Sequence, residues 1–175
     1  AGGVAMNCVM NGRLAEKSFC DDIYIQPAAS DNGVSLGAAL LDAKDKGELK
    51  PKKLNHMYWG PFYSDNQIER SLNAAKLNYN KIEDVSKETA KFIADGKIIG
   101  WFQGRMEVGA RALGNRSILA SPVFPNMKDK INNEVKHRED WRPFCPSILE
   151  EHYEKYIEAS SDSPFMIMAF PVNKA

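Results

Sequence analysis

Clustered cysteines, which could staple a small domain or hold zinc, are missing from this sequence. Its three cysteines, Cys8, Cys20 and Cys145, are far apart among 175 residues and include no CxxC spacing. We therefore expect neither a disulfide framework nor a zinc site. Isolated thiols of this kind are typical of a reducing compartment, which predicts a cytoplasmic protein.

An excess of either charge sign is also missing. Lys plus Arg and Asp plus Glu both number 23, and the formal net charge is +0. Dedicated nucleic-acid binders carry a basic excess, so nucleic acid is not an expected partner of the chain as a whole. Any anion site must be local.

No apolar run approaches the length of a membrane span, and no basic start followed by an apolar stretch indicates a secretory signal. We expect no membrane partner. The chain starts on Ala1 and a glycine pair instead of Met, which favours a fragment of a longer protein. Hydrophobic content of 43% and charged content of 26% are typical of a globular protein.

Helical and strand patterns alternate along the chain and predict the α/β class. Residues 4–14 predict a short helix or a strand-to-helix turn, and further predicted helices cover 33–46, the residues after Ser64-Asp65, the residues from Ser86 to Gly96, and 126–139. Predicted strands cover 23–26, 98–102, 116–120 and 165–172. The helix over 33–46 is rich in apolar and small residues and is expected to be buried, with Asp31-Asn32 capping its start.

The stretch from Lys44 to Lys53 is rich in lysine and contains Gly47 and Pro51. Lysines are costly to bury unpaired, so this stretch predicts an exposed linker. The resulting domains are 1–46 and 58–175, joined by a linker over 47–57.

Two features near the N-terminus suggest a ligand site. Gly2 and Gly3 lack Cβ atoms and would let a phosphate or ribose approach backbone N–H groups at a helix start, although a glycine pair is also a common turn. Asp31 is either a helix cap or a metal ligand. We expect Gly2, Gly3 and Asp31 to face one cleft.

The densest cluster of candidate residues lies between Gly104 and Arg142. Guanidinium groups present planar forks of donors that fit phosphate oxygens, and the glycines of the segment place it in a loop between two predicted strands. Charge-rich segments are often only solvated surfaces. The candidate basic residues are Arg105, Arg111, Arg116, Lys136, Arg138 and Arg142.

The remaining candidates are weaker. His56, His137 and His152 form no HxxxH or HExxH pair and are expected at the surface. The three tryptophans could stack on an adenine, but large aromatic side chains are more often part of the core. These residues are Trp59, Trp101 and Trp141.

Four stretches together resemble the NodU/CmcH family of O-carbamoyltransferases. They are GGVAMN at 2–7, QPAASDNG at 26–33, GRMEVGARALGNRSIL at 104–119 and VKHREDWRPF at 135–144. The third and fourth are long and specific, and all four occur in the family's order.

This resemblance implies two partial domains: the end of an actin and sugar-kinase-like domain that binds a metal and a nucleotide, followed by part of a YrdC-like α/β domain. It implies ATP-dependent transfer of a carbamoyl group from carbamoyl phosphate, through carbamoyl adenylate, to a hydroxyl of a small-molecule acceptor. Gly2, Gly3 and Asn7 fall in the nucleotide-contacting motif, and Asp31 at the metal-ligand position. The six basic residues named above fall in the motifs of the YrdC-like site.

The family's paired metal-binding histidines are absent from this sequence. A divalent metal, iron or magnesium, is therefore expected in the full-length enzyme and not in this fragment, because one carboxylate leaves most coordination positions to water. Two other functions stay open. A nucleotide-binding or RNA-binding module without catalysis would use the basic segment, and a kinase of the actin superfold would use only the first domain.

Overall fold

The structure, a computed structural model, describes residues 2–17, 21–159 and 162–173. Cys20 lies outside the described residues. The chain forms two compact units. Unit 1 contains Ala1–Trp59, Glu107–Leu113 and Ser147–Ala175, and unit 2 contains Gly60–Met106 and Gly114–Pro146. The domain and linker boundaries given above stay a prediction.

Unit 1 contains short helices and a small apolar core that is formed by residues outside these helices. Its elements are η1 (Gly3–Met6), α1 (Cys8–Ala15), η2 (Asp31–Gly33), α2 (Val34–Asp45) and η4 (Glu150–Lys155). Ala28, Met57, Phe165 and Ile167 form the core, and the carbonyl of Met57 accepts a hydrogen bond from the Val108 N–H at 2.8 Å. Segments far apart in sequence therefore share this core.

The two strands predicted within unit 1 are wrong. Residues 22–26 belong to no strand, and the described part of 165–172 forms a single bridge, from Val172 to Ile157. Their apolar alternation reflects burial instead, since Ile25 packs against the core that contains Phe165 and Ile167.

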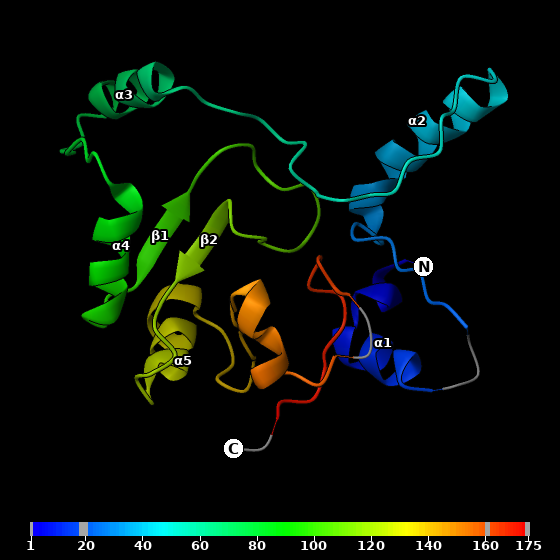
Figure 1. Cartoon of the computed structure of the whole chain (residues 1–175). Helices are drawn as coiled ribbons and strands as arrows, with labels where there is room; N and C mark the ends of the chain where they lie inside the picture. The colour runs from blue at the N-terminus through cyan, green and yellow to red at the C-terminus, as the bar shows by residue number, and fades with distance from the viewer. Residues whose placement is uncertain (1, 18–20, 160–161, 174–175) are drawn as a thin grey trace. The chain divides into compact units, whose positions relative to one another are not determined.

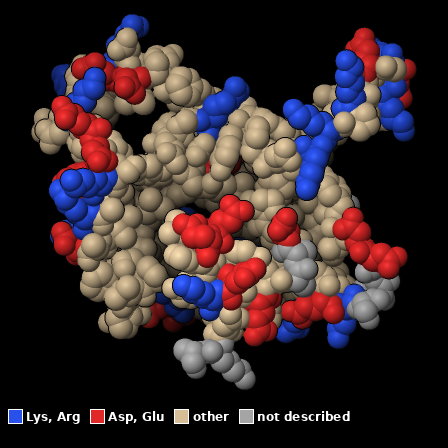
Figure 2. Space-filling model, viewed as in Figure 1, with Lys and Arg blue, Asp and Glu red and all other residues tan. Residues whose placement is uncertain are grey.

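The helix predicted over 33–46 is confirmed as α2, but its predicted burial is wrong, because no residue of α2 is buried. The predicted cap is also wrong: Gly33 occupies the N-cap position without a side-chain hydrogen bond, and Asp31 instead begins the turn η2. The exposure predicted for Lys44–Lys53 is confirmed. Lys and Arg alternate with Asp and Glu at the C-terminal end of α2 (Figure 2).

Unit 2 contains a two-stranded antiparallel sheet and three helical segments (Figure 1). These elements are α3 (Asp65–Ala74), α4 (Val85–Ala94), β1 (Ile99–Phe102), β2 (Arg116–Leu119) and α5 (Met127–Lys130), which continues as η3 (Ile131–Lys136). β1 pairs with β2 in a register that sets Ile99 opposite Leu119 and Phe102 opposite Arg116. The helices and strands predicted for this part of the sequence are thus confirmed within a few residues.

Local side-chain chemistry explains where the first two helices of unit 2 begin. The Gln67 side chain accepts a hydrogen bond from the Ser64 backbone N–H at 2.9 Å, and Asp84 accepts one from the Lys87 N–H at 2.9 Å. Both contacts satisfy backbone donors that a helix start leaves without partners. Among the described helices, none combines the length and apolar character that crossing a membrane requires.

Candidate functional site

The candidate site in unit 2 is formed where the helix α5–η3 ends. His137 adopts a left-handed conformation (φ 47°, ψ 52°), which ends the helix. The backbone N–H of Arg138 then donates to the carbonyl oxygen of Asn132 at 3.0 Å. This turn brings residues 137–142 back beside the last turn of the helix.

An open depression of about 580 Å³ lies at this turn. Its lining residues are Asn133, His137, Arg138, Glu139 and Arg142. Two of the six predicted basic residues, Arg138 and Arg142, are therefore brought together. Two cations and one anion line the depression, so an anionic ligand is favoured there.

Arg138 is held from two sides. Its Nε donates to Oδ1 of Asn132 at 2.8 Å, and its guanidinium carbon lies 4.8 Å from the centre of the Phe144 ring. Among the described residues, Arg138 forms no ion pair with Glu134, its acidic neighbour four residues earlier, and no acceptor contacts its terminal nitrogens. The terminal edge of the fork is thus available to a phosphate or carboxylate.

Arg142 and Glu139 form an ion pair, with Nε 2.8 Å from Oε2. The pKa of the Glu139 carboxyl is lowered from its usual value, first by a hydrogen bond from its own backbone N–H and then by the charge of Arg142. Glu139 is therefore ionised at neutral pH and offsets part of the positive charge in the depression.

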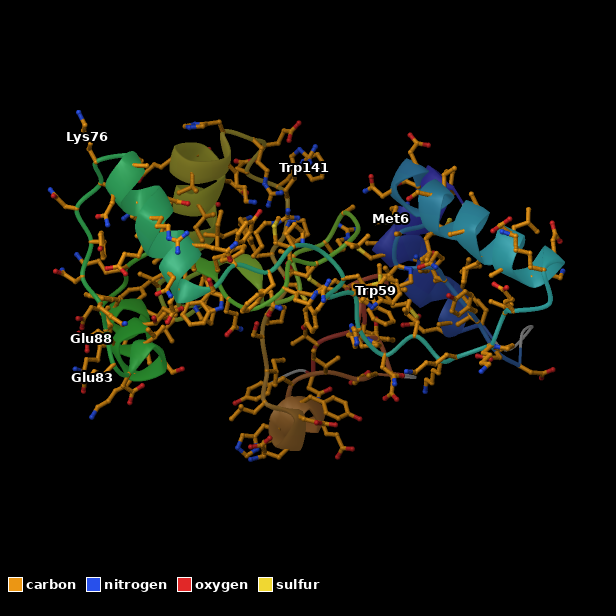
Figure 3. The ribbon with its side chains drawn as sticks, turned by 90° about the horizontal axis from the view of Figure 1, so that it is seen from above. Met6, Trp59, Lys76, Glu83, Glu88 and Trp141 are labelled. Atoms are coloured by element: carbon orange, nitrogen blue, oxygen red, sulfur yellow. The ribbon has the colours of Figure 1, made fainter. Side chains whose placement is uncertain are left out.

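Trp141 is not part of a core, contrary to expectation. It is 70% exposed, and the guanidinium carbon of Arg142 lies 5.6 Å from its ring centre. Figure 3 shows Trp141 on the segment that follows α5. Trp59 is also exposed, whereas Trp101 is half-buried. An exposed aromatic face beside Arg142 is compatible with stacking on a base, which stays a prediction.

Arg105 and Arg116 lie together at one end of the β1–β2 hairpin and are not part of this lining. The Asn115 side chain donates to the backbone oxygen of Arg105 at 2.7 Å, and the Nε of Arg105 donates to the Gly60 carbonyl at 3.1 Å. Lys136, at the end of η3, is exposed and also outside the lining. That Arg105, Arg116 and Arg138 bind one shared ligand stays a prediction.

Arg111 belongs to unit 1, where it contacts the glycine-pair motif. Its Nη2 donates to the carbonyl oxygen of Met6 at 2.9 Å, and the Asn11 side chain donates to the preceding carbonyl, Ala5, at 2.8 Å. The consecutive backbone carbonyls of Ala5 and Met6 are thus both held by side-chain hydrogen bonds. The structure therefore joins two stretches, 2–7 and 104–119, that are about one hundred residues apart in sequence.

Asn7 caps helix α1 by accepting a hydrogen bond from the Met10 N–H at 3.0 Å. It also lines a second depression, of about 540 Å³, together with Arg13, Lys17 and apolar side chains of α1. Gly2 and Gly3 are exposed, and neither they nor Asp31 line this depression. Their expected common cleft stays a prediction.

The described residues do not form a binding set for a divalent metal. They contain no group of three or more His, Cys, Asp and Glu side chains placed to share an ion, and Asp31 is exposed. One carboxylate does not satisfy the coordination of iron or magnesium. The role of Asp31 as a metal ligand stays a prediction, and no chemical step is assigned to a metal.

Three buried polar residues near the candidate residues were not found from the sequence. Asn132 is 0% exposed, Asn11 2% and Glu107 4%. Each contacts backbone groups: Glu107, for example, accepts a hydrogen bond from the Leu113 N–H at 2.8 Å. Asparagine and glutamate are usually exposed, and no local pattern marks these three as buried.

Comparison with known proteins finds two matching family models. Residues 1–40 match the model described as "Carbamoyltransferase N-terminus", and residues 90–175 match "Carbamoyltransferase C-terminus". The first includes Gly2, Gly3, Asn7 and Asp31. The second includes the depression lined by Arg138 and Arg142.

Curated relatives match along the whole chain. Nodulation protein NolNO of Sinorhizobium fredii is 46% identical over 182 residues, covering 100% of this chain and 27% of the relative. Nodulation protein NolO of Bradyrhizobium diazoefficiens is 45% identical, covering 100% of this chain and 33% of the relative. Nodulation protein U of Rhizobium fredii is 32% identical, covering 95% of this chain and 27% of the relative.

The chain thus spans 27% to 33% of the length of these relatives. Both family models lie in the expected order along it, and they contain the glycine-pair motif and the arginine-lined depression at their respective positions. The chain therefore belongs to the carbamoyltransferase family.

Proposed function

We propose that the protein transfers a carbamoyl group from carbamoyl phosphate to a hydroxyl group of a sugar or natural-product acceptor, using ATP. The carbamoyl group is activated as carbamoyl adenylate before transfer. In this proposal residues 1–46 are the end of an actin-like domain that binds nucleotide, and residues 58–175 belong to a YrdC-like domain that carries out the activation.

The observation that carries the proposal is the depression lined by Arg138 and Arg142 within the region that matches the carbamoyltransferase C-terminus. Activation brings two polyanions, ATP and carbamoyl phosphate, close together. Cationic forks offset their repulsion and stabilise the negative charge that develops on pyrophosphate as it leaves. Arginine does this without a proton transfer, because it stays protonated at neutral pH.

The chemistry sets the products that an assay must detect. Carbamoyl phosphate reacts with water to give carbamate and orthophosphate, and an oxygen of carbamate then attacks the α-phosphorus of ATP. The bond from that phosphorus to the bridging oxygen breaks, so pyrophosphate leaves and carbamoyl adenylate remains. In the final step the acceptor oxygen bonds to the carbamoyl carbon, AMP leaves and the hydroxyl proton is released.

The test is release of pyrophosphate from ATP in the presence and absence of carbamoyl phosphate, measured for the full-length protein and its Arg138→Ala variant. Loss of a charge-assisted contact is expected to reduce the rate or affinity roughly tenfold to a hundredfold. Arg138 is only half-buried, so the variant should fold. Pyrophosphate release that is independent of carbamoyl phosphate, or unchanged in the variant, would contradict the proposal.

A further inference from the structure

We infer that Asn132 is a positioning residue for the anion site: it orients the guanidinium of Arg138 and holds the loop that carries Arg142. This inference rests on the proposed function of the depression. It concerns a residue that neither lines the depression nor carries a charge.

Every polar atom of the Asn132 side chain has a partner. Nδ2 donates to the carbonyl oxygens of Asp140 at 3.2 Å and Arg142 at 3.1 Å, while Oδ1 accepts from the Nε of Arg138 at 2.8 Å. The chemistry of these partners fixes the orientation of the amide, because carbonyl oxygens require its donors and Nε–H requires its acceptor. An amide turned the other way would lose all three of these partly buried contacts.

The backbone of Asn132 adds a fourth contact, since its carbonyl accepts from the Arg138 N–H at 3.0 Å. One helical residue therefore binds the loop at 138, 140 and 142. His137, in its left-handed conformation, provides the reversal that allows this. Asn132 therefore holds the loop geometry from the helix side, in addition to the Arg142–Glu139 ion pair within the loop.

Orientation matters because the fork of Arg138 has two edges. Asn132 occupies Nε, and the ring of Phe144 lies 4.8 Å from the guanidinium carbon, so the plane of the group is held. The edge formed by the terminal nitrogens is left to meet two oxygens of a phosphate at once. A fork held in advance loses less conformational freedom on binding than a free arginine side chain.

The experiment is a double-mutant cycle between Asn132 and Arg138 in the full-length protein. Carbamoyl-phosphate-dependent pyrophosphate release gives KM for carbamoyl phosphate and for ATP separately from kcat. All variants are compared at the same concentration of folded protein, and denaturant unfolding measures the folded fraction of each. The variants are Asn132→Leu, Arg138→Ala and the double variant. Asn80→Asp, on an exposed asparagine outside the lining, is the control.

If Asn132 acts through Arg138, Asn132→Leu raises KM for one anionic substrate roughly tenfold to a hundredfold. The double variant then loses less than the sum of the two single losses, because the contact with Arg138 is already absent and only the hold on the loop at 140 and 142 remains to be lost. A purely structural role would lower the folded fraction and the apparent kcat while leaving KM unchanged. Additive losses, or an unchanged KM in Asn132→Leu, would overturn the inference and leave the proposed function standing.

Arg138→Lys keeps the inference testable if Asn132→Leu fails to fold. Lysine keeps the positive charge but has no Nε–H donor that Asn132 could hold beside a planar fork. We expect Arg138→Lys to lose about as much affinity as Arg138→Ala. Affinity near that of the wild type would show that charge alone suffices and would overturn the inference. An unaffected Arg138→Ala would instead contradict the proposed function itself, together with the inference.

Discussion

Arg142 and Glu139 form an ion pair across one turn of the loop, with Arg142 Nε 2.8 Å from Glu139 Oε2. Both side chains are about half exposed, at 47% and 52%, so water screens their attraction. The main consequence of the pair is therefore local charge: Glu139 offsets one of the two cations that line the depression.

Removing this acidic group should strengthen the binding of anions. We expect Glu139→Gln to raise the affinity for pyrophosphate roughly twofold to fivefold, because Arg142 then keeps its full charge for the ligand. Titration calorimetry with pyrophosphate measures this. Glu134→Gln is the matched control, because Glu134 is exposed on the preceding helical segment η3 and lies outside the lining. Equal gains in both variants would indicate a general charge effect and no role for the pair.

The lowered pKa of Glu139 predicts that the stability of the protein depends on pH. The pKa of Glu139 is lowered in the folded protein from its ordinary value of 4.5, so the folded state favours the ionised carboxylate. The resulting stabilisation is present above the unfolded pKa and is lost as the pH falls through the folded pKa. Thermal unfolding of the wild type and Glu139→Gln should therefore differ at about pH 6 and converge toward about pH 3. A difference that stays constant over this range would refute the assignment.

Gly12 should be intolerant of a side chain. A Cβ on this residue would overlap the carbonyl oxygen of Ala169, whose N–H in turn donates to the Cys8 carbonyl at 3.0 Å. Gly12→Ala is expected to destabilise unit 1 by about 1–3 kcal/mol in denaturant unfolding. Gly37→Ala, in α2 with nothing near its Cβ position, should instead stabilise by about 0.5–1 kcal/mol. Similar effects of the two substitutions would contradict the close approach at Gly12.

Lys76 is a site where glycine should improve stability. It follows helix α3 with φ at 53°, and the Leu77 N–H donates to the Leu72 carbonyl at 3.0 Å, as in a helix end closed by a left-handed residue. Lys76→Gly is expected to stabilise unit 2 by about 0.5–1 kcal/mol. Ala75→Gly, at φ −80°, should give no such gain and provides the comparison. Loss of stability in Lys76→Gly would argue against the left-handed conformation.

The parts of the fold that follow from nearby residues were predictable from the sequence. The start of α3 depends on Ser64 and Gln67, three residues apart, and α2 and α4 end beside Gly47 and Gly96. The strands β1 and β2 lie where the sequence shows strand patterns, on either side of a glycine-containing segment. In each of these cases the deciding contacts are local or between adjacent elements.

The parts that depend on distant partners were not predictable in the same way. Residues 22–26 have the composition of a strand, but no second strand pairs with them in the described structure. The apolar face of α2 predicted burial, which requires a packing partner that the helix pattern cannot reveal. Asn11 contacts the carbonyl of Ile167, 156 residues away, so its burial could not be read from its neighbours.

In the candidate site, too, the residue types were predictable from the sequence, but their grouping in space was not. Arginines between glycines marked the region, and Arg138 and Arg142 do line one depression. The sequence pattern treated all six basic residues as one cluster, whereas Arg111 lies in unit 1 and contacts Met6. Side-chain type predicts which ligand a residue suits, but the path of the backbone decides which residues share it.

Asn7 offers a final test, because it has one role in the structure and another implied by the family resemblance. Its Oδ1 caps α1 through the Met10 N–H at 3.0 Å, and the residue also lines a depression with Arg13 and Lys17. A nucleotide would use the same exposed side chain. Aspartate separates the two roles, because it keeps the capping oxygen and adds a negative charge that repels phosphates.

We expect Asn7→Asp to unfold at the same denaturant concentration as the wild type but to bind ATP roughly tenfold more weakly, since one repulsive charge near a polyphosphate costs about as much as one favourable charged contact contributes. Asn7→Ala should lose the cap and destabilise the protein by about 0.5–2 kcal/mol. Denaturant unfolding and equilibrium binding of ATP to the full-length protein measure the two effects separately. Wild-type ATP affinity in Asn7→Asp, combined with destabilisation in Asn7→Ala, would leave Asn7 with the capping role alone and remove it from the nucleotide site.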